Sequence, residues 1–159
     1  MSKIQVAYFS ASGETARLAK TLAGVIGGDL FEIRPQTAYT AADLDWNNAK
    51  SRSSVEMNDP KSRPAMVEIP RLAGYDTVFV GFPIWWYQAP RIIQTFLESA
   101  DFSGKTVIPF VTSGGSGMGK TVELLRSSCA PDTRWNEGKR LSSHASAQEV
   151  SAWTKSLSL

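Results

Sequence analysis

The sequence predicts an α/β fold, a three-layer sandwich in which a parallel sheet of five strands lies between two layers of helices. Segments with the apolar content of strands alternate five times with segments whose apolar residues recur at helical spacing. The clearest strand, residues 75–81, is apolar almost throughout, as expected for a strand that is buried on both faces. Of the 159 residues, 42% are hydrophobic, which is enough for one domain, placed at residues 1–159.

The first elements form a strand, a helix and a second strand. Residues 3–9 are a short apolar strand. Residues 14–26 carry an apolar helical face, and the glycine pair 27–28 ends that helix. Residues 29–34 then predict the second strand.

The segment before the third strand is more polar. Residues 40–43 match a capping box and therefore predict the start of a weaker helix. Residues 50–66 are polar and hold Pro60 and Pro64, so we expect a long surface excursion there.

The second half of the chain repeats the alternation. Residues 105–111 predict the fourth strand, and a weaker fifth strand falls within residues 132–141. Helices are predicted after Pro90, over about 119–129, and after a capping box at 146–149.

Composition excludes several classes of protein. The formal net charge of +2, from 17 basic and 15 acidic residues, is too small to favour nucleic-acid binding. No apolar run reaches the roughly 18–20 residues that span a bilayer, and the N-terminus lacks the apolar core of a signal peptide, so we expect a cytoplasmic protein. One cysteine, Cys129, and one histidine, His144, make a metal site of these residues improbable.

The turn between the first strand and the first helix has the composition of a phosphate site. It holds Ser10, Ala11, Ser12, Gly13, Glu14 and Thr15. Backbone N–H groups and the helix dipole at such a turn can hold a phosphate without lysine or arginine. The alternative is a capped helix that binds no ligand.

The loop after the third strand is aromatic. It holds Pro83, Ile84, Trp85, Trp86 and Tyr87. Flat rings on a rigid turn can sandwich a flat ligand, and we favour Trp85 over Trp86 as the closer contact. The alternative is a partner interface or ordinary packing.

The loop after the fourth strand is rich in glycine. It holds Ser113, Gly114, Gly115, Ser116 and Gly117. Small residues let the backbone approach a ligand closely and offer it N–H groups. The alternative is a flexible turn.

Residues 114–121 also match the nucleotide-binding pattern G-x-x-x-x-G-K-[ST], with Lys120 and Thr121 at its end. The few residues after Thr121 contain no apolar strand ending in the aspartate that would hold Mg²⁺. A nucleoside-triphosphate site therefore stays a remote alternative.

Together the three loops resemble a subgroup of the flavodoxin family, which also has a Phe-Leu-Glu helix end (here residues 96–98) and a Ser-Gly-Lys strand start (here 103–105). The resemblance implies the strand order 2-1-3-4-5 and FMN as a noncovalent cofactor. It implies that residues 10–15 hold the phosphate, residues 83–87 form one wall of the ring pocket, and residues 113–117 hold its polar edge. Glu14 departs from the asparagine that is usual in the family.

The resemblance also implies electron transfer with redox partner proteins. Flavodoxin carriers are typically strongly acidic, however, and this chain is not. An NAD(P)H-dependent FMN oxidoreductase of the quinone-reductase type is therefore the alternative. A third reading is a domain without FMN whose loops bind a protein.

Overall fold

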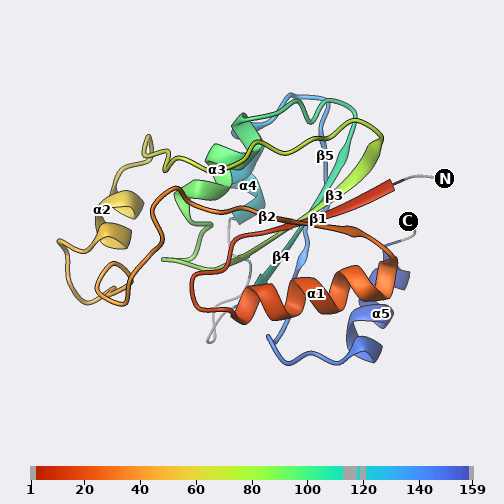
Figure 1. Ribbon diagram of the computed structural model, residues 1–159. Coiled ribbons are helices and arrows are strands. Elements are labelled where there is room, and N and C mark those ends of the chain that lie inside the picture. Colours follow the sequence, from red (N-terminus) through yellow and green to blue (C-terminus); the bar gives the residue numbers. More distant parts are fainter. Residues whose placement is uncertain (1–2, 113–117, 119–120, 158–159) are drawn as a thin grey trace.

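A computed structural model describes residues 3–112, 118 and 121–157. It contains one sheet, whose strands run parallel in the order β2-β1-β3-β4-β5, as the resemblance implies (Figure 1). The strands are β1 (Lys3–Tyr8), β2 (Asp29–Glu32), β3 (Tyr75–Pro83), β4 (Thr106–Thr112), β5 (Arg134–Trp135) and β6 (Lys139–Arg140). The predicted flavodoxin-like fold class and strand order are confirmed.

The fifth position in the sheet is filled by two short strands, because β5 and β6 both pair with β4. The gap between them lies opposite Pro109. The carbonyl groups of Val107 and Val111 accept bonds from this side of the sheet, so Pro109 faces the same side but has no N–H to donate. Gly138 lies against it with φ +76°, and a Cβ there would stand 2.1 Å from the Pro109 oxygen.

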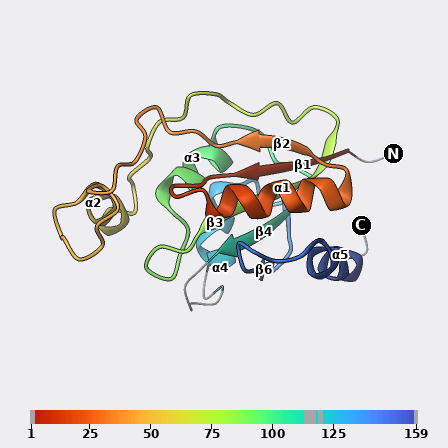
Figure 2. The same ribbon diagram turned by 60° about the horizontal axis from the view of Figure 1, so that its bottom comes forward.

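Helices cover both faces of the sheet. The helices α1 (Glu14–Ile26) and α5 (Ala147–Ser156) lie on one face, whereas α3 (Arg91–Glu98) and α4 (Thr121–Leu125) lie on the other (Figures 1 and 2). Alternate residues of β1 serve the two layers: Val6 and Tyr8 belong to the core under α1 and α5, and Ala7 belongs to the core under α3.

Most helix boundaries follow the signals in the sequence. The helix α1 spans the predicted residues, and Gly27 ends it with φ +66°. Pro90 precedes α3, and the hydroxyl oxygen of Ser146 accepts the Glu149 N–H at the start of α5. The predicted helix over 119–129 becomes α4 followed by a 3-10 turn (Arg126–Ser128), with residues 119–120 outside the described residues.

The segment between β2 and β3 differs from its prediction. Thr40 and Asp43 do exchange the two capping-box bonds, at 2.9 and 3.1 Å, but only turns follow. The predicted helix there is wrong, because no apolar helical face follows the cap. A helix forms instead inside the predicted excursion, as α2 (Arg52–Asn58), where Ser51 caps the Ser54 N–H. We call residues 37–58 the arm. Its helix lies outside the sandwich, beyond the carboxyl ends of the strands (Figure 2).

Within the described part of the chain, no helix is both long enough and apolar enough to cross a bilayer.

Candidate functional site: an aromatic cavity at the carboxyl edge of the sheet

The sheet brings two of the three predicted loops together. The Phe9 N–H donates to the Gly81 carbonyl at 2.9 Å, and the Ile84 N–H donates to the Thr112 carbonyl at 3.0 Å. The loops after β1 and β3 therefore leave the sheet side by side, at the edge where parallel sheets bind ligands. The third predicted loop, comprising Ser113, Gly114, Gly115, Ser116 and Gly117, lies outside the described residues.

The first loop is an ordered turn into α1. The Gly13 N–H donates to the Ser10 hydroxyl at 3.0 Å, and Gly13 itself has φ +91° at the helix start. Ser12 and Glu14 are exposed, and Ala11 is half-buried. Because the first N–H groups of a helix have no partner within it, this turn can bind an anion.

Thr15 lies deeper than the sequence suggests. Its side chain is 2% exposed, and its hydroxyl lies 2.8 Å from the Thr112 hydroxyl. The pair connects the first helical turn to the end of β4, where the third predicted loop begins.

A basic residue that the sequence does not predict as part of the site lies near this turn. Arg140 and Glu14 help to line a cavity of about 220 Å³, together with Thr112, Leu141, Ser142 and Ser143. Residues from β6 thus reach the start of α1. Arg140 lies within the weakly predicted fifth strand, so no local pattern in the sequence indicates that it reaches this turn.

The aromatic loop is a two-residue β-hairpin. The Trp85 N–H donates to the Gln88 carbonyl at 2.9 Å, and the Gln88 N–H donates back to Trp85 at 3.1 Å. Trp86 and Tyr87 occupy the turn with φ of +49° and +64°. Such turns favour asparagine or glycine, because left-handed backbone costs other residues about 1–2 kcal/mol each. Strain of this kind clusters at functional sites.

The three aromatic residues have different environments. Trp85 is partly buried and meets Phe9 and Tyr39 edge to face, with ring centroids 5.7 and 5.4 Å apart. Trp86 is 41% exposed and Tyr87 is 72% exposed. Trp85 therefore packs against the body of the protein, whereas its two neighbours remain accessible.

A cavity of about 430 Å³ joins the two loops and the arm. It is lined by Ala11, Ser12, Leu44, Trp46, Ser53, Pro83, Ile84, Trp85, Trp86 and Tyr87. None of these side chains is charged. Seven of them belong to the loops that the sequence predicts as a binding site, whereas Leu44, Trp46 and Ser53 come from the arm and were not predicted. Turns and one short helix position these three, and neither gives a periodic signal.

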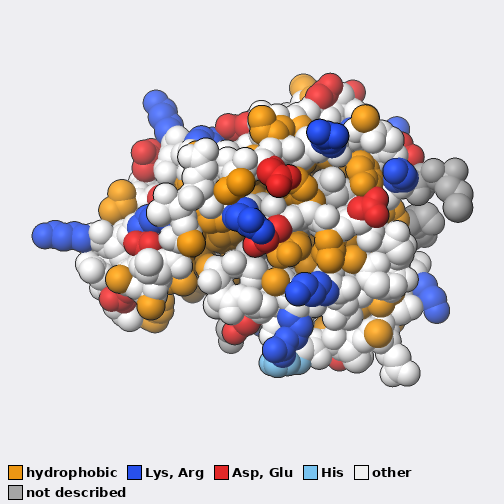
Figure 3. Space-filling model, in the orientation of Figure 1, with side chains coloured by type: hydrophobic (Ala, Val, Ile, Leu, Met, Phe, Trp, Pro, Cys, Tyr) orange, Lys and Arg blue, Asp and Glu red, His pale blue; other side chains and the backbone are white. Residues whose placement is uncertain are grey.

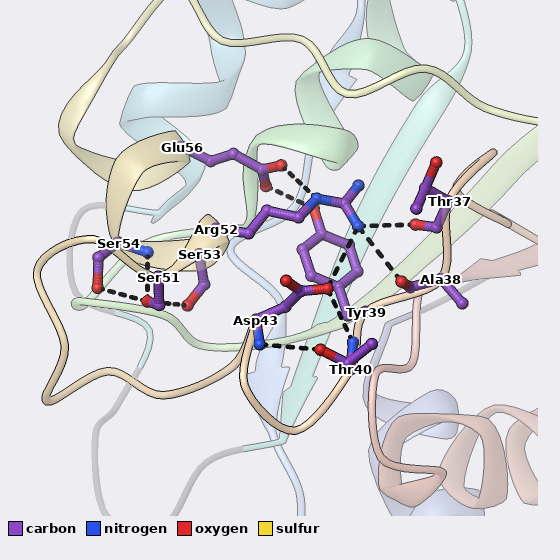
Figure 4. Close-up of polar contacts among 10 residues, drawn as sticks. All are labelled: Thr37, Ala38, Tyr39, Thr40, Asp43, Ser51, Arg52, Ser53, Ser54 and Glu56. Atoms are coloured by element: carbon purple, nitrogen blue, oxygen red, sulfur yellow. Dashed lines mark hydrogen bonds and ion pairs between the residues drawn. The ribbon is translucent and has the colours of Figure 1, made fainter.

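A polar network holds the arm in shape (Figure 4). The Arg52 guanidinium lies over the Tyr39 ring, 3.8 Å from its centroid, and donates to Glu56 at 3.0 Å and to the Thr37 carbonyl at 2.8 Å. The Tyr39 hydroxyl donates to Glu56. Burial, followed by the bond to Glu56, raises the pKa of the Tyr39 hydroxyl. Tyr39 thus links the arm to Trp85 in the hairpin.

Arg91 at the start of α3 joins the arm to the same hairpin. Its guanidinium is buried and donates to the Met57 carbonyl at 2.7 Å, to the Glu56 carbonyl at 3.3 Å, and to the Gln88 side chain at 3.1 Å. All three acceptors are neutral oxygens. Burial, and then the charge of Arg63, lower the pKa of Arg91.

The nucleoside-triphosphate alternative loses support. Thr121, which would have to reach Mg²⁺, is fully buried, and its hydroxyl donates to the Met118 carbonyl. Lys120 lies outside the described residues. Within the part of the chain that the structure describes, no three His, Cys, Asp or Glu side chains gather as metal ligands would.

Comparison with known proteins identifies the family. A family model described as Flavodoxin matches residues 3–157. No curated protein matches the chain.

Several flavoproteins of known structure are similar to this chain. A candidate flavoprotein from Bacteroides eggerthii DSM 20697 is 51% identical, with a TM-score of 0.93, over 100% of this chain and 99% of that chain. One from Bacteroides uniformis ATCC 8492 is 53% identical, with a TM-score of 0.92, over 97% and 98%. A flavoprotein from Lactobacillus acidophilus NCFM, solved in complex with FMN, is 21% identical, with a TM-score of 0.71, over 97% and 99%. With nearly all of its length matched by the family model, the chain belongs to the flavodoxin family.

Proposed function

We propose that this protein binds FMN noncovalently at the carboxyl edge of the sheet and transfers electrons through it. The observation that carries the proposal is the juxtaposition of two unlike surfaces. An uncharged, aromatic cavity lies beside the start of α1, so one site offers a place for a flat neutral ring and another for an anionic phosphate. Membership of the flavodoxin family and the FMN complex of the Lactobacillus relative support it.

The described residues fit the two ends of FMN. The turn of residues 10–15 would hold the phosphate with backbone N–H groups and the Ser10 and Ser12 hydroxyls. The side chains of Trp86 and Tyr87 are exposed at the cavity and would pack against the ring. Glu14 is exposed, so its carboxylate can stay in solvent. Bound FMN supplies the reversible uptake of electrons, and the protein tunes that uptake through charge and hydrogen bonds.

The phosphate provides the sharpest test of this assignment. Riboflavin carries the same ring as FMN but lacks the dianion, so it should bind much more weakly. Replacing Ser10 with alanine should weaken FMN by about 1–3 kcal/mol, the range for one charge-assisted bond, and leave riboflavin binding nearly unchanged. Fluorescence titration measures all four affinities, and equal affinity for the two flavins would contradict the proposal.

A second candidate function is reduction of a small acceptor with electrons from NAD(P)H, in place of exchange with redox partner proteins. The arm favours it, because Leu44, Trp46 and Ser53 add a wall that the three predicted loops do not supply. NADPH added to the FMN-loaded protein without oxygen distinguishes the two. Rapid bleaching of the flavin absorbance is expected of a reductase, whereas a carrier should bleach only after a partner reductase is added.

A further inference from the structure

We propose that the arm builds an acceptor subsite next to the flavin, and that this subsite takes a flat, uncharged ring compound with carbonyl oxygens, of the quinone class. The inference rests on the proposed binding of FMN. It assigns a role to Leu44, Trp46 and Ser53, none of which belongs to the predicted flavin loops.

The walls of the cavity come from two different parts of the fold. Six lining residues come from the loops after β1 and β3, Pro83 ends β3, and the other three come from the arm. Trp46 is 70% exposed although it lines the cavity, so most of its indole is free to cover a second ring. Trp86 lines the same cavity from the hairpin. Aromatic walls contributed by two different segments suit a flat guest.

The charged side chains of the arm stay out of the cavity. The arm carries Asp43, Arg52 and Glu56, but these side chains bond to one another and to Tyr39 and none of them lines the cavity (Figure 4). A charged acceptor would enter this uncharged space without a counter-ion, at a large cost in desolvation. The lining therefore selects neutral compounds.

The Ser53 hydroxyl offers a hydrogen-bond donor at the cavity wall. Ser53 is 2% exposed and lines the cavity, and its oxygen lies 3.5 Å from that of Ser51, at the outer limit of a hydrogen bond. Ser51 in turn donates to Ser54 at 3.0 Å. The Ser53 proton is thus weakly held and can turn to a carbonyl oxygen of a guest. A guest that accepts this bond should bind more tightly, because a buried hydroxyl without a partner is costly.

The subsite is formed before any ligand binds. The capping bonds between Thr40 and Asp43, together with the Arg52 network, fix the turns that carry Leu44 and Trp46. The Ser53 N–H also donates to the Asp43 carbonyl at 2.9 Å. A wall that is already ordered loses little entropy when a ligand binds.

The electron balance is simple. Two-electron-reduced FMN is oxidised and gives two electrons and two protons to the acceptor, counting those that solvent supplies. Both carbonyl groups of the quinone become hydroxyl groups, and the reduced flavin ring loses the hydrogens on two of its nitrogens. The electrons that first reduce FMN come from a reduced nicotinamide or a reductase partner; in the test below they come from dithionite.

The test measures reoxidation of the FMN-loaded protein. Protein reduced with a stoichiometric amount of dithionite is mixed without oxygen with menadione, a neutral quinone, or with ferricyanide, a small and highly charged acceptor. Trp46→Ala should lower the second-order rate with menadione about tenfold, equivalent to about 1.4 kcal/mol, and change the ferricyanide rate less than about twofold. Ser53→Ala should act in the same direction. Val55→Ala is the matched control, because Val55 is a 56% exposed apolar residue of the same arm that does not line the cavity.

Two results would overturn the subsite. One is an unchanged menadione rate in both variants. The other is an FMN dissociation constant that rises in Trp46→Ala by the same factor as the menadione rate falls, because Trp46 would then be a wall for the flavin. A wild-type protein that takes up no FMN would fail before any acceptor is added, and that result would contradict the proposed function itself.

Discussion

At the scale of single residues, Tyr87 in the hairpin turn should lower the stability of the protein while it contributes to FMN binding. Tyr87 has φ +64° and a side chain that is 72% exposed, so its ring contributes little packing to offset a strained backbone. We expect Tyr87→Gly to raise the free energy of unfolding by about 1 kcal/mol and to weaken FMN binding. Urea unfolding and FMN titration measure the two effects. Gly104→Ala is the converse control: its φ is +70° with open space around a Cβ, so this variant should lose stability from backbone strain alone. A Tyr87→Gly variant that loses both stability and affinity would show that the ring packs against the protein.

The two tryptophans of the hairpin should differ in their effects on stability and on FMN binding. Trp85 is held between Phe9 and Tyr39, so Trp85→Ala should destabilise the protein without FMN by about 3 kcal/mol. Trp86→Ala should cost less than about 1 kcal/mol, since Trp86 is 41% exposed. The sequence predicts that Trp85 is the closer contact of the flavin. The exposure of Trp86 in the structure favours Trp86 instead. Quenching of tryptophan fluorescence by FMN decides between them. The alanine variant of the tryptophan that lies closer to the flavin should lose the larger part of this quenching.

Cys129 should make the folded protein less stable as the pH rises above neutrality. Burial, and then the charge of Glu98, raise the pKa of its thiol to about 12. The unfolded thiol ionises near its ordinary value of about 8.5. Between these two pH values the unfolded chain has released the proton and the folded chain has not, so stability should fall as the pH rises. Unfolding midpoints measured from pH 7 to 11 should therefore decline less steeply in Cys129→Ala than in the wild type. Equal slopes would show that the thiol is accessible to solvent.

At the scale of elements, Arg91 should contribute more to stability than its place at the start of a helix suggests. It bonds the C-terminal carbonyls of α2 to Gln88 at the base of the hairpin. Lysine keeps the charge but cannot present the same planar set of donors. Arg91→Lys should therefore cost about 2–3 kcal/mol, as buried carbonyls lose their partners. Arg34→Lys, in an exposed pair with Glu32, should cost less than about 0.5 kcal/mol. Chemical denaturation compares them, and similar losses would mean that Arg91 does not brace the arm.

The elements differ in how far the sequence could predict them. The helix α1 has a glycine at each end and an apolar face, and β3 is continuously apolar, so local signals specify both. The divided fifth strand depends on the contact of Gly138 with Pro109, which are distant in sequence. The arm is held by Arg52 and Arg91 through contacts between segments, and no period reveals these. Hence the sequence predicted the sheet and two walls of the cavity, but not the third wall.

At the scale of the whole molecule, charge bears on the choice of electron acceptor. The chain carries 17 basic and 15 acidic residues, and the two kinds are interspersed over the face shown in Figure 3. Carriers that dock by complementary fields lose rate steeply as salt rises, because ions screen the attraction beyond about 10 Å at 0.1 M. A molecule without a strong field of one sign has little such attraction to lose.

The salt dependence of electron transfer follows from this charge distribution. Reduced, FMN-loaded protein should transfer electrons to a basic cytochrome at a rate that changes less than about threefold between 10 and 200 mM salt, because net charge steers association only when one sign dominates. The rate with a neutral quinone should not change at all, which makes it the internal control. Stopped-flow absorbance measures both rates under the same conditions. A cytochrome rate that falls tenfold or more would reveal a local acidic patch that the even distribution of charge conceals, and it would favour a protein acceptor over a small one.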